Sequence, residues 1–367
     1  MRRPERRSTY NRNRDGNWFS MSEGWRRALI ERGARAENGL ASGFDPVRPP
    51  RTDQTALTAL LSHGVIRASG QDAEAFLQGQ LSNDIGLVSD SRAEPAAYCT
   101  PKGRVLATPL LWWNDGGYAL GLPRELSEPV RRRLQMYVLR SKATLSDLSD
   151  QIAALGLAGS GAMDLAREAL GVALSGPYQA ASSGGLTAIA LPGDRVQVMG
   201  EAALVVDLWD KLAGRCWVAD EAVWTAHAIT AGVPTITSAT QDQFTLHMLN
   251  LDLTGAVSFS KGCYTGQEIV ARTQYLGQVK RRLLRFATAG RAETAAGVCA
   301  EGQPVGTVVN AAPSASGGWE LLAVVQVQAA RGAGVRLTLG ADGPPLTLLP
   351  LPYELSETPL RHAGEGG

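Results

Sequence analysis

The feature that most constrains the fold is a change in the character of the sequence at about Phe286. From Leu57 to Phe286, stretches with a helical period alternate with stretches rich in β-branched and aromatic residues. After Phe286 the chain consists of short β-rich segments separated by glycine and proline, and none has a strong helical period. The sequence therefore predicts an α+β fold: a body of mixed helices and strands over residues 51–285, and a small β-barrel or sandwich module with a tail over residues 286–367.

The body is expected to alternate strands with amphipathic helices. Two of its strands flank the sequence NDGG at 114–117, which is typical of a tight β-hairpin turn. Apolar residues at helical spacing mark the helices, as Phe76, Leu77 and Leu81 do in the first of them. We predict strands at 64–70, 104–113, 117–123, 151–157 and 194–200, and helices at 72–85 and 126–139.

Charge is distributed unevenly along the chain. The 36 lysine and arginine residues nearly balance the 35 aspartate and glutamate residues, so the formal net charge is +1. Residues 1–36 nevertheless carry ten arginines and four acidic residues, a net charge of +6, which leaves −5 for residues 37–367. Because the body has an acidic excess, we do not expect it to bind nucleic acid directly.

The basic N-terminal part is expected to lie outside the body. Residues 1–20 are rich in arginine and asparagine and lack a hydrophobic period, which predicts disorder. Residues 39–52 are rich in glycine and proline, as linkers are, so we assign residues 1–50 to a leader and linker. Met21 opens a stretch with an ordinary helical pattern. Two interpretations stay open: translation naturally starts at Met21, or residues 1–20 form a basic arm.

The usage of cysteine and histidine excludes several kinds of site. The four cysteines, Cys99, Cys216, Cys263 and Cys299, are far apart and form no CxxC pair, and the chain has only four histidines. This pattern predicts neither a zinc site nor a disulfide framework, and it is typical of a reducing compartment. No stretch approaches the roughly 18 apolar residues that span a bilayer. We therefore expect a cytoplasmic protein without a metal site or a membrane partner.

The segment KGCYTGQEIVAR, residues 261–272, contains the densest set of chemically informative residues. Thr265 and Glu268 have the spacing of a capping box, in which each side chain bonds to the backbone near the other. This spacing predicts a helix from about Gly266 toward Tyr275, with Thr265 as its N-cap.

Cys263 would then lie near the positive end of the helix dipole, and Lys261 would add a nearby cation. Both influences favour a thiolate, which makes Cys263 the best candidate in the chain for a reactive thiol. The alternative for any single cysteine is a small buried side chain, and we prefer that interpretation for the other three cysteines.

Trp224 is a candidate ligand-binding residue. It lies in VWTAHAITAGVP, a helical stretch that Gly232 and Pro234 end. A tryptophan in such a stretch is most often part of the core. An indole ring also provides a flat wall on which a planar heterocycle can stack, so both interpretations stay open.

Several segments resemble, in the same order along the chain, those of a known family. The chain is similar to the YgfZ-type folate-binding proteins, which are relatives of the glycine-cleavage T protein, an aminomethyltransferase. The resemblance covers roughly residues 57–355, and KGCYTGQE is its most specific element. The matching segments are 77–84 (LQGQLSND), 99–104 (CTPKGR), 137–144 (YVLRSKAT), 231–234 (AGVP), 261–272 and 351–353 (LPY).

This resemblance implies two interleaved α/β parts around a central folate cleft, with a C-terminal β-barrel module on one side. It implies binding of tetrahydrofolate or a derivative, and support for the assembly or repair of iron–sulfur enzymes, including enzymes of tRNA modification. Those enzymes or their assembly factors are the implied partners. Cys263 is the implied functional thiol beside the cleft, and Trp224 the implied pterin contact. The candidate ligand-binding residues also include Asp84, Lys261, Gly262, Tyr264, Gln267 and Arg272.

Two departures from the family pattern bear on activity. T-protein enzymes have an acidic pair just after a glycine-rich hairpin, where this chain has Ala107 and Thr108. Without that carboxylate no proton acceptor for aminomethyl transfer is evident, so classical turnover is not expected. Relatives also carry a glutamate where this chain has Thr230, so either folate binding is weaker or another residue, such as Asp84, accepts from the pterin edge.

Two other functions stay open as alternatives. Folate-dependent aminomethyl transfer, a one-carbon transfer reaction, is the enzymatic alternative. Direct tRNA binding is a third hypothesis, for which the local basic patch at 280–285 would be the footprint.

Overall fold

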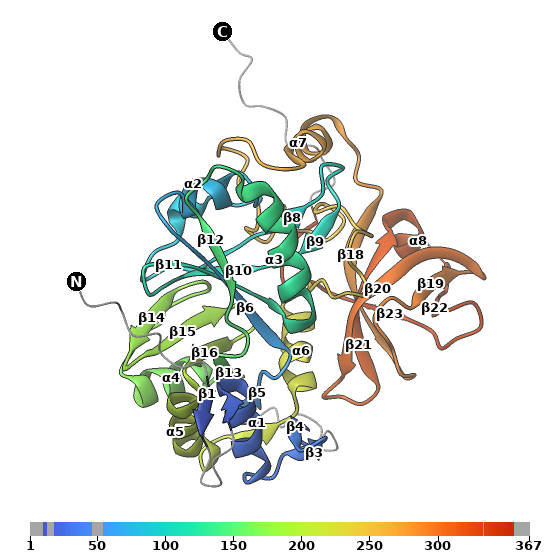
Figure 1. The fold of residues 1–367 in the computed structure, drawn as a ribbon. Helices are drawn as coiled ribbons and strands as arrows, with labels where there is room; N and C mark the ends of the chain where they lie inside the picture. Colours follow the sequence, from blue (N-terminus) through green and yellow to red (C-terminus); the bar gives the residue numbers. More distant parts are fainter. Residues whose placement is uncertain (1–9, 13–17, 46–53, 333, 356–367) are drawn as a thin grey trace.

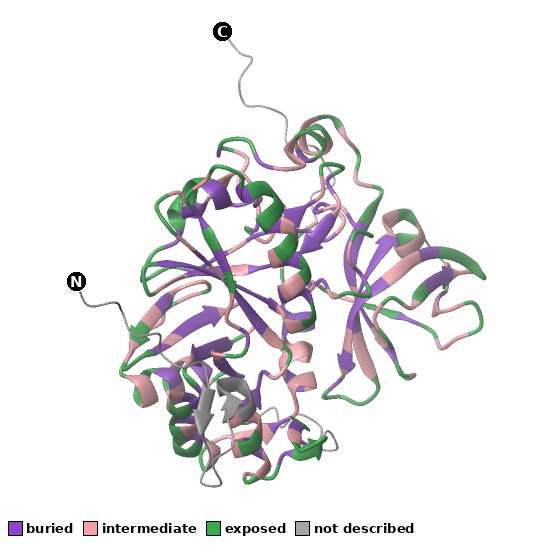
Figure 2. Cartoon of the chain, in the orientation of Figure 1, coloured by how far each residue is buried: buried purple, intermediate pink, exposed green. Residues whose placement is uncertain are grey.

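A computed structural model describes residues 10–12, 18–45, 54–332 and 334–355 of the chain (Figure 1). Two sheets with their covering helices form the body, and a third sheet, orange to red in Figure 1, forms a separate module at its side. Most strand residues of the body are buried, whereas the helices expose their outer faces (Figure 2). Over the described ranges, no helix has both the length and the apolar character needed to cross a bilayer.

The first body sheet has five antiparallel strands in the order β12-β6-β11-β10-β7. Asp115 and Gly116 join β10 to β11 with φ of 47° and 75°, the left-handed conformations of a type I′ hairpin turn. Helix α3 packs on β6 and buries Leu126, Val130 and Leu134, whose spacing of four forms one apolar stripe. The elements of this part are β6 (His63–Ser69), α2 (Ala73–Gln78), η1 (Ile85–Leu87), β7 (Glu94–Pro95), β8 (Tyr98–Cys99), β9 (Val105–Ala107), β10 (Leu110–Asn114), β11 (Gly117–Pro123), α3 (Arg124–Val138) and β12 (Thr144–Asp147).

The second body sheet has six strands in the order β14-β15-β16-β13-β5-β17. All its pairs are antiparallel except β17 with β5. The chain passes from β5 in this sheet to β6 in the first sheet and returns at β13, so the two parts are interleaved as the resemblance implies. The elements are β5 (Ala56–Ala59), β13 (Ala153–Ala158), α4 (Ala162–Leu170), β14 (Ala180–Ser183), β15 (Leu186–Leu191), β16 (Arg195–Gly200), α5 (Ala202–Ala213), β17 (Trp217–Ala219) and α6 (Glu221–Thr230).

The N-terminal segment differs from the predicted leader. Residues 21–45 contain α1 (Met21–Ile30), β3 (Arg35–Glu37) and β4 (Leu40–Gly43), so they belong to the body rather than to a disordered leader and linker. Trp25 and Phe44 pack on Trp209 of α5, with ring centroids 5.6 and 5.3 Å away. The helical start expected at Met21 is confirmed. Two short strands, β1 (Tyr10–Arg12) and β2 (Trp18–Ser20), pair ahead of it, and the remainder of the predicted disorder lies outside the described residues.

The C-terminal module is the curled antiparallel sheet that the sequence predicts. Its strand order is β22-β19-β20-β21-β18-β23, and it begins at Arg281, five residues before the predicted boundary. The sheet closes on itself because Leu346 N–H donates to Leu337 O (2.9 Å) and Leu339 N–H donates to Pro344 O (3.0 Å). The elements are β18 (Arg281–Thr288), β19 (Gly297–Ala300), β20 (Gln303–Pro313), β21 (Trp319–Gln326), α8 (Val327–Arg331), β22 (Leu337–Leu339) and β23 (Thr347–Leu349).

The body and the module are held together across α6 and the turn that follows it. The Asn310 side chain of β20 accepts from Thr235 N–H (2.8 Å) and donates to Thr235 O (2.9 Å). Tyr353 O–H donates to Gly232 O at 2.8 Å. Gly232 has φ of +66°, and a Cβ there would lie 2.7 Å from the Tyr353 ring, so both its conformation and its contact require glycine. The matched segments AGVP and LPY therefore meet in space.

Candidate functional site

A cavity of 680 Å³ lies where the two body sheets, α6 and the C-terminal module meet. It is lined by the residues after β5, the ends of β11 and β16, the inner face of α6 and part of β20. A volume of this size is typical of sites that enclose a small organic ligand. This junction lies between the two interleaved parts of the body and beside the module, where the resemblance implies a central cleft.

Trp224 lines this cavity from α6. The guanidinium carbon of Arg195 lies 4.7 Å from the centroid of its ring, so one indole face carries a stacked cation. A Cβ at Gly156 would lie 2.6 Å from Trp224 Cε3, so the glycine of β13 makes room for the indole. The ring is therefore fixed in the wall by neighbours from two strands.

Arg195 is a site residue that the sequence analysis missed. It is 4% exposed at the start of β16, and its Nε donates to Pro192 O at 2.9 Å. Burial lowers the pKa of Arg195 to about 10. No carboxylate of the described residues forms an ion pair with this guanidinium. The available signal was an arginine at the first position of a mostly apolar strand, where a charge is at risk of burial.

Gln197 and His63 add polar groups to the same wall. Gln197 Nε2 lies 3.1 Å from His63 Nε2 and 3.1 Å from Met199 Sδ, so both of its contacts in the wall are made by the amide nitrogen. Burial lowers the pKa of His63 to about 4, so the imidazole is neutral near pH 7. The wall therefore offers a neutral ring and an amide carbonyl beside a single buried cation.

Two carboxylates line the cavity, and both accept hydrogen bonds from backbone groups. Glu221, the first residue of α6, accepts from Ser62 N–H (3.1 Å) and Ser62 O–H (2.6 Å), and burial raises its pKa. Glu125 accepts from Ser238 N–H at 2.7 Å. Thr108, at the position where T-protein enzymes have an acidic residue, lines the cavity with its hydroxyl accepting from Ile236 N–H at 3.2 Å.

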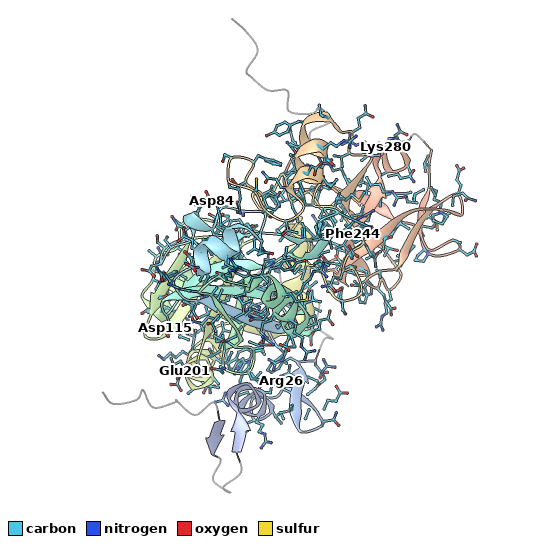
Figure 3. All side chains as sticks on the ribbon, turned by 45° about the horizontal axis from the view of Figure 1, so that its top comes forward. Arg26, Asp84, Asp115, Glu201, Phe244 and Lys280 are labelled. Atoms are coloured by element: carbon cyan, nitrogen blue, oxygen red, sulfur yellow. The ribbon has the colours of Figure 1, made fainter. Side chains whose placement is uncertain are left out.

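The two acceptors considered for the pterin edge do not line the cavity. Thr230 is exposed, and its hydroxyl accepts from Arg285 at 3.3 Å. Asp84 caps η1, where it accepts from Gly86 N–H (3.1 Å) and from Gln78 Nε2 (2.9 Å). Figure 3 shows Asp84 well away from Arg26, which does line the cavity. The Gln197 carbonyl is one neutral acceptor in the cavity lining.

Lys261 is used differently from the cation expected beside Cys263. Its ammonium donates to three backbone carbonyls, those of Gln78, Leu81 and Asn83, at 2.8, 2.8 and 2.7 Å. It also lies 5.4 Å from the centroid of the Tyr264 ring, and burial lowers the pKa of Lys261 to about 8. Lys261 thus fastens the KGCYTGQE segment to the loop between α2 and η1.

The helix after Cys263 is confirmed, but its predicted cap is wrong. Helix α7 (Gln267–Leu276) begins after Gly266, which has φ of +88° and no side-chain cap. A Cβ at Gly266 would lie 2.6 Å from Thr100 O, so the chain packs tightly on the β8–β9 hairpin there. This contact selects a glycine turn over the capping box. Gln267 Oε1 instead accepts from Tyr264 N–H at 3.2 Å.

Cys263 is exposed just before this turn, whereas Cys99 and Cys299 are buried and Cys216 is partly buried. Gly262 and Arg272 are also exposed, and none of the described atoms lies within 4 Å of a Cβ built at Gly262. The predicted site residues therefore divide into two groups. Trp224 lines the cavity, and Asp84 and the residues of the 261–272 segment lie outside it.

Residues 81–83 contact both the cavity wall and the segment that carries Cys263. Ser82 lies between the Leu81 and Asn83 carbonyls that hold Lys261, and its hydroxyl donates to Ala256 O at 2.6 Å. Ala256 lines the cavity. The anchor of the Cys263 segment is thus directly behind the cavity wall.

The fold defines the class of protein. The structure matches the glycine cleavage system aminomethyltransferase T of Bartonella henselae with a TM-score of 0.71 over 88% of this chain and 95% of that chain, at 17% sequence identity. The chain therefore has the aminomethyltransferase T fold.

Sequence comparison identifies the family within this class. The chain is 31% identical over 309 residues to the "tRNA-modifying protein YgfZ" of Yersinia pseudotuberculosis, covering 82% of this chain and 93% of that protein. It is 32% identical over 244 residues to the protein of the same name from Escherichia coli O157:H7, covering 65% and 74%. No protein-family model matches the chain. The chain belongs to the YgfZ family.

Proposed function

We propose that this protein binds tetrahydrofolate or a derivative in the central cavity, in the cytoplasm. We further propose that it supports the assembly or repair of iron–sulfur enzymes, including those that modify tRNA, with Cys263 as its functional thiol. The observation that carries the folate proposal is the Trp224–Arg195 stack in the wall of the 680 Å³ cavity, where the buried guanidinium has no carboxylate partner among the described residues.

The residues of the cavity fit the chemistry of a folate. A planar pterin can stack on the guanidinium that covers Trp224 or on the indole itself, because arginine and aromatic planes are interchangeable platforms for a flat ring. The Gln197 carbonyl can accept from a ring N–H. The charge of Arg195 favours an anionic or carbonyl-rich ligand over a cationic one. Bound tetrahydrofolate would supply a carrier of one-carbon units.

Two observations support a role for Cys263 beside the cavity. The thiol is exposed, as a group that meets a partner must be. Its segment is anchored by Lys261 to the loop whose Ser82 holds the cavity wall at Ala256. A single thiolate supplies one ligand of the four that iron–sulfur clusters take, so the partner enzyme or assembly factor would supply the others. The name of the relatives supports the connection to tRNA modification.

The folate proposal is tested by titrating the protein with tetrahydrofolate under anaerobic conditions while following tryptophan fluorescence. We expect a saturable change that Trp224→Leu abolishes. Trp319→Leu is the matched control, because Trp319 lies on β21 of the C-terminal module and does not line the cavity. No saturable change in the wild type, or equal binding by the two variants, would overturn the proposal.

Aminomethyl transfer remains the alternative function, and one observation favours it. Glu221 is a cavity carboxylate whose pKa is raised by burial, which is the direction of shift expected of a general base or acid. It lies on α6 rather than after the hairpin, so it is not the acidic residue of T-protein enzymes. Folate-dependent release of ammonia from an aminomethyl donor, lost in Glu221→Gln, would establish this activity in place of the accessory role.

A further inference from the structure

A second cavity, of 810 Å³, lies outside the proposed folate site. It is bounded by the C-terminal half of α7, the segment 277–282, the end of β21 and α8. Neither Trp224 nor Cys263 lines it. Figure 3 shows Lys280, which lines this cavity, on the side of the C-terminal module, well separated from Arg26 in the wall of the first.

The charges of this cavity are strongly one-sided. Of the described residues that line it, four carry a permanent positive charge, and a single one carries a carboxylate. That carboxylate, Asp252, is neutralised by Arg282 with N–O distances of 2.7 and 3.0 Å, and both side chains are buried. The remaining cations are Lys280, Arg281 and Arg331, all exposed. The cavity therefore has a closed, neutral ion pair at its base and a positive rim.

Two of the rim cations are available to a ligand. Among the described residues, none accepts a hydrogen bond from the Lys280 ammonium or the Arg281 guanidinium or forms an ion pair with either. His247 adds no charge near pH 7, because burial lowers its pKa, and its Nε2 lies 2.9 Å from Gln274 Oε1. An anion entering the cavity would thus meet two uncompensated charges and no competing carboxylate.

The rest of the lining is apolar or carries primary amides. Phe259, whose ring makes an edge contact with Tyr275 at 6.4 Å, provides an aromatic surface. Side-chain amides, which both donate and accept hydrogen bonds, can read the edge of a heterocyclic base. The apolar residues are Leu253, Val257, Val279, Val327 and Leu355, and the amides are those of Gln274, Gln278, Gln326 and Gln328.

We propose that this cavity binds a nucleoside phosphate. The exposed cations would take the phosphate groups, and the apolar and aromatic wall with its amides would take the base. A simple inorganic anion would contact only the cations, and an uncharged heterocycle would contact only the apolar wall. A nucleoside phosphate contacts both. The volume of 810 Å³ is within the range of cavities that enclose ligands of this size.

This site is separate from the proposed folate site, although the two share a wall. Leu251, Thr254 and Ala256 face the central cavity, whereas Asp252 and Val257 line the second one. The nucleotide proposal therefore stands or falls independently of the folate proposal.

The test is calorimetric titration of the full chain with ATP and with GTP, compared with adenosine and with tripolyphosphate. We expect at least one of the nucleotides to bind saturably, and we expect adenosine and tripolyphosphate each to bind about tenfold more weakly or less. No saturable binding of either nucleotide would overturn the proposal. Tripolyphosphate binding as tightly as the nucleotide would also overturn it, because the wall would then play no part.

Charge variants locate the binding. Lys280→Gln and Arg281→Gln should each weaken nucleotide binding about threefold to tenfold. Lys211→Gln is the matched control, since Lys211 is an exposed cation on α5 that lines neither cavity. Both rim residues are exposed, so the variants should unfold at the wild-type urea midpoint. Nucleotide binding unchanged in both rim variants, or lost in Trp224→Leu, would place it elsewhere and contradict the proposal.

Discussion

Arg195 is 4% exposed and stacked on Trp224, and it has a lowered pKa because burial opposes its charge. A buried cation without a carboxylate partner is costly for folding, which is why we propose a binding role for it. At the scale of single residues, the folate proposal therefore depends on this guanidinium and on the indole beneath it.

The first prediction separates binding from stability at this position. Arg195→Met should weaken tetrahydrofolate binding at least about tenfold, because it removes the cation. The free energy of unfolding should change by no more than about 1 kcal/mol or should rise, because the cost of burying the charge is removed with it. Calorimetry and urea denaturation measure the two effects. Unchanged affinity would show that Arg195 only fills space.

The second prediction concerns the pH dependence of stability. The folded-state pKa of His63 is about 4 and its ordinary value is 6.5, so between these values the unfolded state binds a proton that the folded state does not. The free energy of unfolding should therefore fall as the pH falls from about 6.5 to about 4, by up to about 1.4 kcal/mol per pH unit for one proton.

Urea denaturation across this pH range checks the effect. His63→Gln removes the titrating group, so its stability should depend less steeply on pH in the same window. Identical slopes for the variant and the wild type would show that His63 does not titrate as its burial requires.

The third prediction concerns the thiol. Cys263→Ser should fail to complement a bacterial strain that lacks its own YgfZ, measured as the activity of an iron–sulfur enzyme of tRNA modification. Cys216→Ser is the matched control, because Cys216 is a partly buried residue that lines neither cavity. Full complementation by Cys263→Ser at equal protein levels would rule out an essential role for the thiol.

At the scale of elements, the start of α7 depends on a single glycine. Gly266 has φ of +88°, and a Cβ there would lie 2.6 Å from Thr100 O on the β8–β9 hairpin. A neighbouring glycine, Gly262, has open space around the corresponding position. A side chain is therefore excluded at Gly266 but tolerated at Gly262, although the two positions are only four residues apart.

The fourth prediction uses this pair. Gly266→Ala should lower the free energy of unfolding by about 1–3 kcal/mol, because it adds both backbone strain and a clash with a carbonyl. Gly262→Ala should change it by about 0.5 kcal/mol or less. Denaturant unfolding of the two variants measures the difference. Equal stabilities would mean that α7 can begin without the glycine turn.

The same helix shows how far the sequence could predict the site. The spacing of Thr265 and Glu268 predicted that a helix follows Cys263, and α7 lies there although the capping box does not form. The capping box was wrong because the packing of Gly266 on Thr100, a contact between residues far apart in sequence, decided the turn. Lys261 was expected to be a cation beside Cys263. Its three carbonyl partners were not predicted, because they come from residues about 180 positions earlier in the chain.

For the other elements too, features set by local sequence patterns were predicted, and features set by contacts between distant residues were not. The hairpin at Asp115 and helix α3 are formed by local patterns, and both were predicted. Helix α1 was assigned to the leader because of the arginines around it. The helix nevertheless has an apolar face, on which Trp25 and Leu29 are buried. Arg195 and its place over Trp224 could not be predicted, because the pair forms only when β16 and α6 meet.

At the scale of the whole molecule, the central cavity lies where the two interleaved parts of the body and the C-terminal module meet. Both body sheets, α6 and β20 of the module contribute to its lining. Asn310 and Tyr353 fix the module to the turn after α6, next to that lining. A ligand in this position contacts every part at once, so its binding should stabilise the complete molecule and not one lobe.

The measurement that tests the folate proposal most directly is urea unfolding with and without tetrahydrofolate. A ligand that binds only the folded state at 100 times its dissociation constant stabilises that state by about 2.7 kcal/mol. We predict such an increase for the wild type and for Trp319→Leu, and none for Trp224→Leu. An unfolding midpoint that tetrahydrofolate leaves unchanged in the wild type, or raises equally in Trp224→Leu, would contradict a folate site in the central cavity.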